Sequence, residues 1–163
     1  KYGGHPQACG FSLTSVDRLK EFAERINVLA IEELKNIDTT PILSIDCEIE
    51  LSAVQMELYD FLKKFEPFGQ HNKQPTFLIK NTIISDLRAL GKDEQHLKLK
   101  VHNGRGISRS VIGFCFGDEE KKGVNWCTKL KVGDTIDIIA NIEINEWNGH
   151  SDLQLVLKDL RLA

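Results

Sequence analysis

The feature that most constrains the fold is a run of five strand-like segments from Thr76 onward. Each segment is rich in branched apolar residues, and turn-forming Gly, Asn and Asp residues separate neighbouring segments. The segments are residues 76–90, 96–101, 108–116, 135–145 and 151–158, and the first is expected to bend near Ser85. Because the segments are short and the turns between several of them are tight, the pattern predicts a small β domain.

The connections between the segments select among the β architectures. Residues 118–131 are mostly polar but include Trp126, which we expect to anchor a short helix there. Asn103 and Gly104 predict a tight type I′ hairpin between the second and third strands. Five strands with a helical insert after the third is the order of an OB-fold, a small Greek-key barrel. An SH3-like barrel or a five-stranded sandwich is the alternative, and the position of the longest connection favours the OB-fold.

The chain before the barrel predicts a loop, a helix and a strand. Residues 3–13 are interpreted as a Gly-rich loop. Thr14 and Asp17 resemble a capping box, and apolar residues then recur at helical spacing as far as Leu34. Residues 43–51 alternate strictly between apolar and polar, which is typical of a half-buried strand.

A second helix should connect this strand to the barrel. Ser52 and Gln55 form a second capping box, and the helix is expected to run to about Lys64, before Pro67 and Gly69 end it. The predicted fold class is therefore α+β and mainly β, with a five-stranded OB-fold barrel preceded by a helix–strand–helix segment. We divide the chain into residues 1–40, a connecting strand and helix at 41–69, and the barrel at 70–163.

Composition and cysteine spacing exclude several classes of protein. Of 163 residues, 41% are hydrophobic and 28% charged, which is ordinary for a globular domain. No apolar run approaches the ~20 residues that span a bilayer, so no membrane association is expected. The four cysteines form no CxxC pair, so neither a disulfide framework nor a zinc site is indicated, and the cytoplasm is the expected location. The chain opens on Lys1 without a start methionine or signal peptide, and we expect it to be a piece of a longer protein.

Basic residues concentrate in one stretch of a chain whose net charge is -3. Residues 70–112 carry eight Lys or Arg against three Asp or Glu, whereas residues 1–60 are acidic. A polyanion would therefore bind through a local patch in the basic stretch. An ordinary solvated surface is the alternative.

The second predicted strand carries the main candidates for phosphate binding. By the period of two, its apolar residues share one face and its basic residues the other. The basic residues are His96, Lys98, Lys100 and His102. Ammonium groups at this spacing suit successive phosphates, and in an OB-fold this strand belongs to the usual nucleic-acid face. The alternative is that this is only the solvated face of an antiparallel strand.

Few aromatic side chains are present for base stacking. Trp147 and Asn148 lie at the tip between the fourth and fifth strands, in a loop that OB-folds commonly use to hold ligands. Trp147 is accordingly a candidate for stacking on a base, and a lid over the barrel end is its alternative role. Phe114 and Phe116 are expected to pack in the core.

The corner at residues 67–75 adds two polar candidates. The amides of Gln70 and Asn72 could hold a phosphate or a base edge. Pro67 and Phe68 are expected to be structural, the first ending the helix and the second filling the junction.

A second loop, near the N-terminus, combines two glycines with a histidine. Gly3 and Gly4 would let the backbone approach a phosphate closely, and His5 adds a switchable donor. No further ligands cluster around His5 and Cys9, so no metal site is predicted in this chain.

Four stretches together resemble the C-terminal part of the RecJ family, single-stranded-DNA-specific exonucleases of the DHH phosphoesterase superfamily. They are GGHPQACGF at 3–11, PFGQ and PTF within 67–77, GK and HLK within 91–98, and EINEWNG at 143–149. The first is similar to the GGH motif that closes the DHHA1 domain, and the others to the OB domain and the corner before it. The resemblance implies that residues 1–40 end a DHHA1 domain and that 70–163 are the OB-fold domain.

The resemblance also implies an activity for the longer protein. In this family a DHH domain holds two Mn²⁺ or Mg²⁺ ions, a metal-activated water attacks the phosphodiester, and DNA is degraded from the 5′ end in repair and recombination. The resemblance places substrate contacts on Gly3, Gly4 and His5 of the DHHA1 loop, and the turn at Lys92 matches an OB-domain signature. No DHH-type cluster occurs in this sequence, so we expect the metals and catalysis to lie outside it, with no cofactor in this chain.

Single-stranded DNA is the expected partner, with a single-strand-binding protein or a helicase as further candidates. Three other interpretations stay open. The barrel could be a non-catalytic module that binds a repair protein, which would show as partner binding insensitive to salt and DNA competitors. The chain could belong to a phosphoesterase of the superfamily that acts on short nucleotides or tRNA, although most such relatives lack an OB domain. It could also be a stand-alone single-strand binder.

Overall fold

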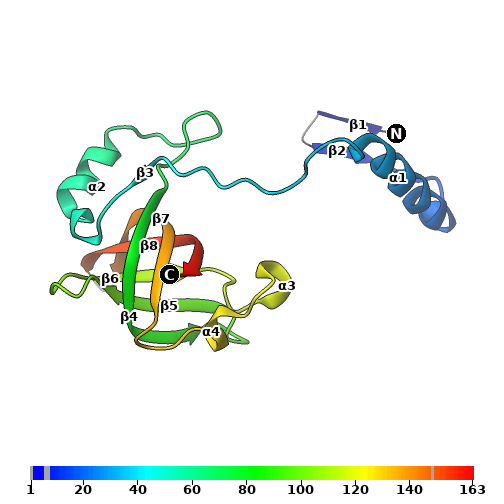
Figure 1. The fold of residues 1–163 in the computed structure, drawn as a ribbon. Helices are drawn as coiled ribbons and strands as arrows, with labels where there is room; N and C mark the ends of the chain where they lie inside the picture. Colours follow the sequence, from blue (N-terminus) through cyan, green and yellow to red (C-terminus); the bar gives the residue numbers. More distant parts are fainter. Residues whose placement is uncertain (1, 6–7, 148) are drawn as a thin grey trace. The chain divides into compact units, whose positions relative to one another are not determined.

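Two compact units make up the chain, and they divide after Leu43. The computed structural model describes residues 2–5, 8–147 and 149–163, with the side chains of all of these except Trp147 and His150. The first unit holds a hairpin and a helix, and the second holds a closed β-barrel with short helices around it (Figure 1).

The first unit begins with a β-hairpin where the sequence predicts a loop. Strand β1 (Tyr2–His5) runs antiparallel to β2 (Ala8–Phe11), with Gly4 opposite Cys9. A Cβ at Gly4 would lie 2.5 Å from the Cα of Cys9, so a larger residue does not fit there. The loop prediction was wrong because glycine here permits close approach of two strands instead of making a turn.

Helix α1 (Leu19–Leu34) confirms the first predicted helix, and a 3₁₀ turn at Val16–Arg18 precedes it. The capping residue is Ser15 and not the predicted Thr14. The Oγ of Ser15 accepts a hydrogen bond from the backbone N–H of Asp17 at 3.3 Å, which satisfies one of the free donors at the start of the turn.

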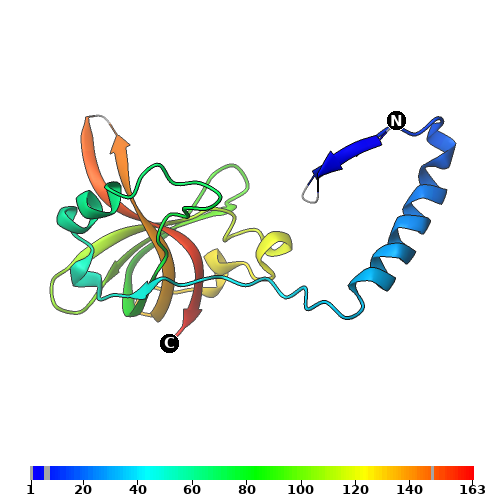
Figure 2. The same ribbon diagram turned by 90° about the horizontal axis from the view of Figure 1, so that it is seen from above.

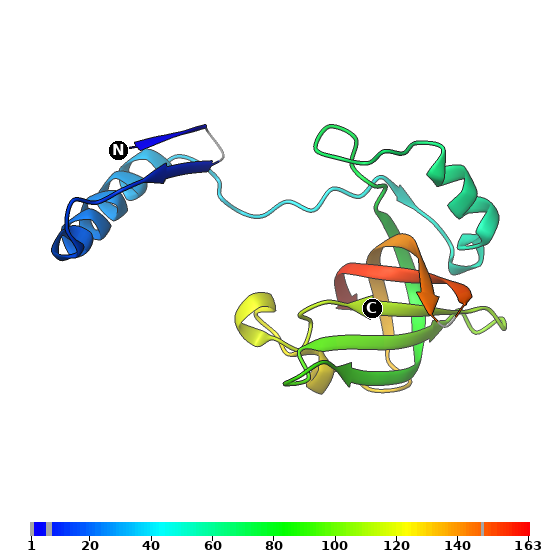
Figure 3. The same ribbon diagram turned by 180° about the vertical axis from the view of Figure 1, so that it is seen from behind.

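The second unit starts with short elements that lead into the barrel. Strand β3 (Cys47–Glu48) is parallel to the start of β4, and a 3₁₀ turn at Leu51–Ala53 precedes helix α2 (Met56–Lys63). Leu51 and Val54 are buried in the barrel core. Helix α2 lies over one side of the barrel, as Figures 1 and 3 show, and its inner side chains pack against the core.

Both elements are shorter than the sequence predicts. The strand expected at 43–51 pairs with β4 only at Cys47–Glu48, because β4 begins at Phe77 and a 3₁₀ turn begins at Leu51. Leu43 and Ile45 beyond the pairing are each 42% exposed. The second helix starts at Met56, and the predicted capping box does not form, since the side-chain amide of Gln55 donates to the carbonyl of Ser52 at 2.7 Å.

Five strands close the barrel and confirm the predicted OB-fold. They are β4 (Phe77–Leu90), β5 (His96–His102), β6 (Ser108–Gly113), β7 (Thr135–Trp147) and β8 (His150–Leu162). The strand order is β4-β5-β6-β8-β7, and β7 pairs back onto β4. The pair β6 and β8 is parallel and the other pairs are antiparallel. Figure 2 shows β7 and β8 extending as a long hairpin beyond the barrel body.

Strand β4 is shared between two neighbours, which requires it to bend. Residues 77–83 pair with β7, and residues 83–90 pair with β5. A register shift between Ile84 and Asp86 marks an irregularity at Ser85, and this confirms the predicted bend. A second shift lies between Ile79 and Thr82, where Asn81 has a φ of 54°.

Two connections differ in detail from the prediction. The insert contains two short helices, α3 (Glu119–Lys122) and α4 (Trp126–Lys129), because Gly123 at φ 70° ends the first (Figure 3). The predicted two-residue hairpin is a longer loop over residues 103–107, with Gly104 and Gly106 at φ 73° and 88°. A type I′ turn needs positive φ at Asn103 too, which that residue does not adopt.

The barrel interior is filled as the alternation of the strands predicts. The inward residues of β5, Leu97, Leu99 and Val101, are buried, and Trp126 of the insert packs against the same core. Within the part of the chain that the structure describes, every helix is too short or too polar to cross a membrane.

Candidate nucleic-acid interface

Rows of paired residues cross the outer face of the barrel. Lys98 on β5 lies between Arg88 on β4 and Ile112 on β6. Lys100 lies in the next row, opposite Asp86. Because successive side chains alternate between faces, the two lysines point outward, with about 6.6 Å of strand between them.

A surface groove of about 820 Å³ runs along this face. It is bounded by the start of α2, by strands β4, β5 and β6, and by the start of β8. The residues that line it are Gln55, Met56, Glu57, Asp86, Arg88, Lys98, Leu99, Lys100, Ser108, Arg109, Ser110, Ser151, Asp152 and Leu153. The outward side chains of Lys98 and Lys100 therefore share one groove.

The groove is mixed in charge, because both basic and acidic side chains line it. Arg88 forms a salt bridge with Asp86 at 3.0 Å. Arg109 donates from Nε to the carbonyl of Val54 at 2.6 Å. Within the described part of the chain, Lys98 and Lys100 form no salt bridge. Their charges are therefore available to an anion in the groove.

Arg88 and Arg109 were not among the predicted site residues. Arg88 points to the outer face because the register of β4 shifts at Ser85. Its position therefore follows from the bend and not from simple alternation along the strand. The signal that could have identified Arg88 was the predicted bend. Arg109 pairs with the inward Val101, and alternation alone would place it on the inner face.

His96 lies at the end of the same outer face, away from the groove. Its Nδ1 accepts a hydrogen bond from the backbone N–H of Cys115 at 3.1 Å, so the neutral ring carries its proton on Nε2. Its ring meets that of Phe114 edge to face, with centroids 5.5 Å apart. Both groups border the turn that follows β6.

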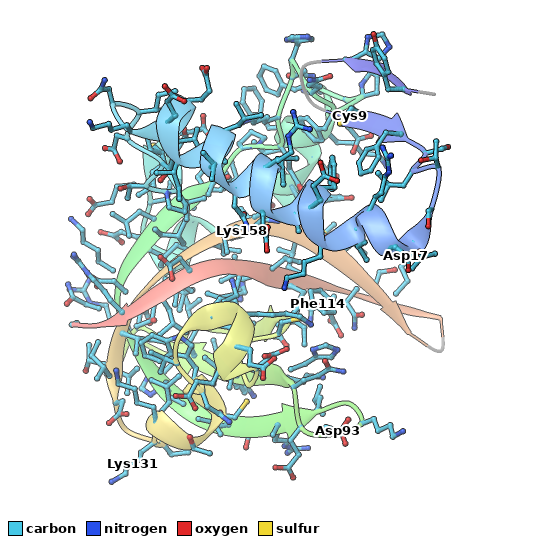
Figure 4. The ribbon with its side chains drawn as sticks, turned by 90° about the vertical axis from the view of Figure 1, so that its right-hand side faces the viewer. Cys9, Asp17, Asp93, Phe114, Lys131 and Lys158 are labelled. Atoms are coloured by element: carbon cyan, nitrogen blue, oxygen red, sulfur yellow. The ribbon has the colours of Figure 1, made fainter. Side chains whose placement is uncertain are left out.

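Phe114 is exposed, and its predicted place in the core was wrong. It is 57% exposed, whereas Phe116 is 1% exposed and confirms the prediction. Alternation would place both rings on one face, but β6 ends at Gly113 and Cys115 adopts a φ of 63°. The left-handed residue reverses the chain between the two rings. Figure 4 labels Phe114 beside the insert that begins with α3.

A lysine of the insert stands near this turn. The ammonium of Lys121 lies 3.1 Å from the carboxylate of Asp118 and 3.8 Å from Sγ of Cys115. The hydrogen bond to Asp118 raises the pKa of Lys121, and the same bond lowers the pKa of Asp118. Lys121 therefore keeps its positive charge.

The corner at residues 67–75 is held by Asn72. Its side-chain nitrogen donates to the carbonyls of Phe65 at 2.7 Å and Pro67 at 3.0 Å. Its backbone pairs with that of Gly69. These bonds give Asn72 a structural role, and Gln70 is exposed on the same turn. Contacts of either residue with DNA stay predictions.

Three of the other predicted residues lie in the hairpin of the first unit. Gly3, Gly4 and His5 are exposed on β1. Lys92 is exposed in the turn between β4 and β5, and it does not line the groove. Their contacts with a strand stay predictions.

The predicted residues at the tip of the long hairpin fall partly outside the described structure. The backbone of β7 reaches Trp147, but the side chain of Trp147 and the whole of Asn148 lie outside the described residues. Among the residues that the structure does describe, no group of three or more His, Cys, Asp or Glu side chains could hold a metal ion.

The closed barrel, with its first three strands in sequence and its third strand parallel to its fifth, defines the second unit as an OB-fold. The sequence model of the RecJ OB domain family matches residues 45–159 of this chain. The chain therefore belongs to the RecJ OB domain family, as its sequence motifs predict.

Curated relatives of the chain are single-stranded-DNA-specific exonucleases named RecJ. The protein from Bacillus subtilis is 28% identical over 99% of this chain, and that from Salmonella typhimurium is 26% identical over 98%. The chain spans only 20% and 26% of the lengths of these two relatives. Among solved structures, Thermus thermophilus RecJ in complex with Mn²⁺ matches the whole chain with a TM-score of 0.69 at 23% identity, over 22% of its own length. The similarity to the Thermus thermophilus structure shows a shared fold.

Proposed function

We propose that this chain is the part of a RecJ-like 5′-to-3′ exonuclease that binds single-stranded DNA and guides it, in DNA repair and recombination. The observation that carries the proposal is the groove in which Lys98 and Lys100 lie without salt-bridge partners among the described residues. It lies on the face that OB-folds use for oligonucleotides. The relatives are named single-stranded-DNA-specific exonucleases, and this name supplies the substrate class.

The physical basis of binding is neutralisation of phosphates. Each lysine ammonium that neutralises a phosphate releases counterions condensed on the strand. Because this release is less favourable at high salt, binding weakens as the salt concentration rises. Two lysines in adjacent rows suit successive phosphates of an extended strand. The net charge of -3 would repel DNA elsewhere, so the local groove has to provide the attraction.

Cleavage is proposed for the part of the longer protein that this chain does not cover. Solved RecJ structures contain Mn²⁺ or Mg²⁺, and such ions would activate the attacking water there. Binding and positioning of the strand are the roles proposed for this chain.

The remaining predicted contacts are secondary parts of the same proposal. Gly3, Gly4 and His5 would contact the strand nearer the catalytic domain. Trp147 with Asn148 would stack on a base and hold it, and Lys92 would add charge. A single-strand-binding protein or a helicase as partner, and the cytoplasm as location, also belong to the proposal.

Replacement of both lysines tests the groove. Lys98→Ala/Lys100→Ala should weaken binding of an oligothymidine of about 16 nucleotides and reduce the slope of log K against log salt by up to about two. Fluorescence anisotropy across a salt series measures both quantities. A matched variant that removes two exposed lysines elsewhere on the second unit, Lys64→Ala/Lys131→Ala, should change the slope much less.

Two outcomes would contradict the proposal. Equal slopes for the wild type and the groove variant would remove the two lysines from DNA binding. Binding of a repair protein that ignores both salt and competing oligonucleotides, with no DNA binding, would favour the non-catalytic interaction module.

A further inference from the structure

We infer that Phe114, together with His96, is a stacking platform for one unpaired base at the end of the outer face. This inference rests on the proposed function, because it names a further contact of the same strand. It starts from a ring that is 57% exposed next to a buried neighbour of the same type. An exposed aromatic ring offers a flat apolar face, and a base is a flat group of suitable size to stack on it.

The backbone conformation of the turn after β6 holds the ring of Phe114 outside the core. Cys115 has a φ of 63°, a conformation that a residue with a Cβ adopts only under constraint. The constraint is visible in the hydrogen bond from its N–H to Nδ1 of His96 at 3.1 Å. Phe116 then fills the core at 1% exposure and fixes the other side of the turn. Phe114 is thus held outward by three neighbours.

The arrangement of the two rings leaves a surface for stacking. Their planes are inclined by 75°, with centroids 5.5 Å apart. In such an edge-to-face pair each ring keeps at least one face that its partner does not cover. The neutral His96 also has its Nε2–H free of the bond to Cys115, so it can donate to a base edge or a phosphate.

The platform lies next to Lys98 on the outer face of β5. His96 precedes Lys98 by two residues on β5, and Phe114 comes two residues after Ile112, which pairs with Lys98. His96 is therefore displaced along β5 by about 6.6 Å from Lys98, and the ring of Phe114 lies against that of His96. A base stacked there places its own phosphate within reach of Lys98. Cations next to an aromatic surface favour a base of a polyanionic strand over an apolar peptide.

Three substitutions of Phe114 test the inference in the full chain, with the same oligothymidine as probe. Phe114→Ala should weaken binding about 5- to 150-fold without changing the salt slope, because a base loses its stacking partner while the phosphate contacts remain. Phe114→Leu should lose affinity to a similar extent, since it is apolar but not flat. Phe114→Tyr should bind within about twofold of the wild type, because its ring is retained.

A matched control and a structural check accompany these variants. Phe61→Ala removes another exposed phenylalanine, 53% exposed on α2, and should leave affinity unchanged. Thermal unfolding of each Phe114 variant should match the wild type, since the ring is not part of the core.

The outcomes separate this inference from the proposed function. Wild-type affinity in Phe114→Ala, with the lysine variant weakened, overturns the platform and leaves the groove intact. Full binding by Phe114→Leu overturns base stacking in favour of apolar contact. A chain whose oligonucleotide binding does not respond to the lysine substitutions overturns the proposed function itself.

Discussion

At the scale of single residues, a buried carboxylate connects three strands of the barrel. Asp137 on β7 has a side chain that is 7% exposed. Its Oδ1 accepts from the backbone N–H of Asn81 at 3.0 Å, and its Oδ2 accepts from Nε and Nη2 of Arg161 at 3.0 and 2.8 Å. Burial raises the pKa of Asp137, but the bonds from Asn81 and Arg161 outweigh it, so its pKa lies below the ordinary 3.8.

This lowered pKa predicts a loss of stability in acid. A carboxyl whose folded-state pKa is below the unfolded value stabilises the fold above that value, and the contribution is lost as the pH falls through the folded pKa. The free energy of unfolding should therefore decrease below about pH 4, and Asp137→Asn should remove this part of the decrease. At pH 7 the same variant should be less stable by about 1–3 kcal/mol, because a charged acceptor is lost.

Urea unfolding at pH 7 and at acid pH measures both effects. Asp60→Asn replaces an exposed carboxylate on α2 and serves as the control, with stability expected within about 0.5 kcal/mol of the wild type. If Asp137→Asn kept the full acid sensitivity of the wild type, the stabilising role of this carboxylate would have to be abandoned.

At the scale of elements, the end of β6 depends on a glycine. A Cβ at Gly113 would lie 2.8 Å from Cδ2 of Phe116 and 3.1 Å from Cδ2 of Leu157. Both neighbours are buried in the core and have little room to move. Gly113→Ala should therefore destabilise the barrel by about 1–3 kcal/mol through overpacking.

A second glycine provides the comparison for this variant. A Cβ at Gly69 would meet no atom within 4 Å, and its φ is outside the left-handed range. Gly69→Ala should stay within about 0.5 kcal/mol of the wild type in the same urea titration. Equal stability of the two variants would mean that the turn after β6 can expand.

The elements that the sequence predicts well are those with long, regular patterns. The five barrel strands and the bend at Ser85 follow from alternation that lasts six residues or more. The strand expected at 43–51 has equally clear alternation, but alternation does not show where pairing with β4 begins or where the chain turns away, and the two strands meet over two residues. The capping residues shifted because several Ser, Thr and Gln residues lie next to each helix start.

The candidate site was predictable to the extent that it lies on a regular strand. Lys98 and Lys100 share an outward face because β5 has no irregularity between them. Phe114 could not be placed correctly, because a strand that ends at Gly113 no longer follows the period of two. Cysteine seldom adopts a left-handed φ, so nothing in the sequence marks Cys115 as the residue at which the chain turns.

At the scale of the whole molecule, the buried apolar core lies in one of the two units. Its buried members all fall between Leu51 and Leu160, in the unit that begins at Ser44. In the first unit, no described residue of α1 is buried, and apolar residues such as Ile26 and Leu29 are about half exposed. The hydrophobic stabilisation of the described chain therefore comes from the barrel and the elements packed on it.

Removal of residues 1–43 is accordingly expected to leave the barrel stable. The free energy of unfolding should change by less than about 0.5 kcal/mol, because none of the described side chains among residues 2–43 is buried. Leu51→Ala in the full chain is the opposite case, since it empties a core position that is 3% exposed and should destabilise by about 2–5 kcal/mol. Urea unfolding followed by circular dichroism measures both. If the shortened chain lost as much stability as Leu51→Ala, the assignment of the hydrophobic stabilisation to the barrel unit would be wrong.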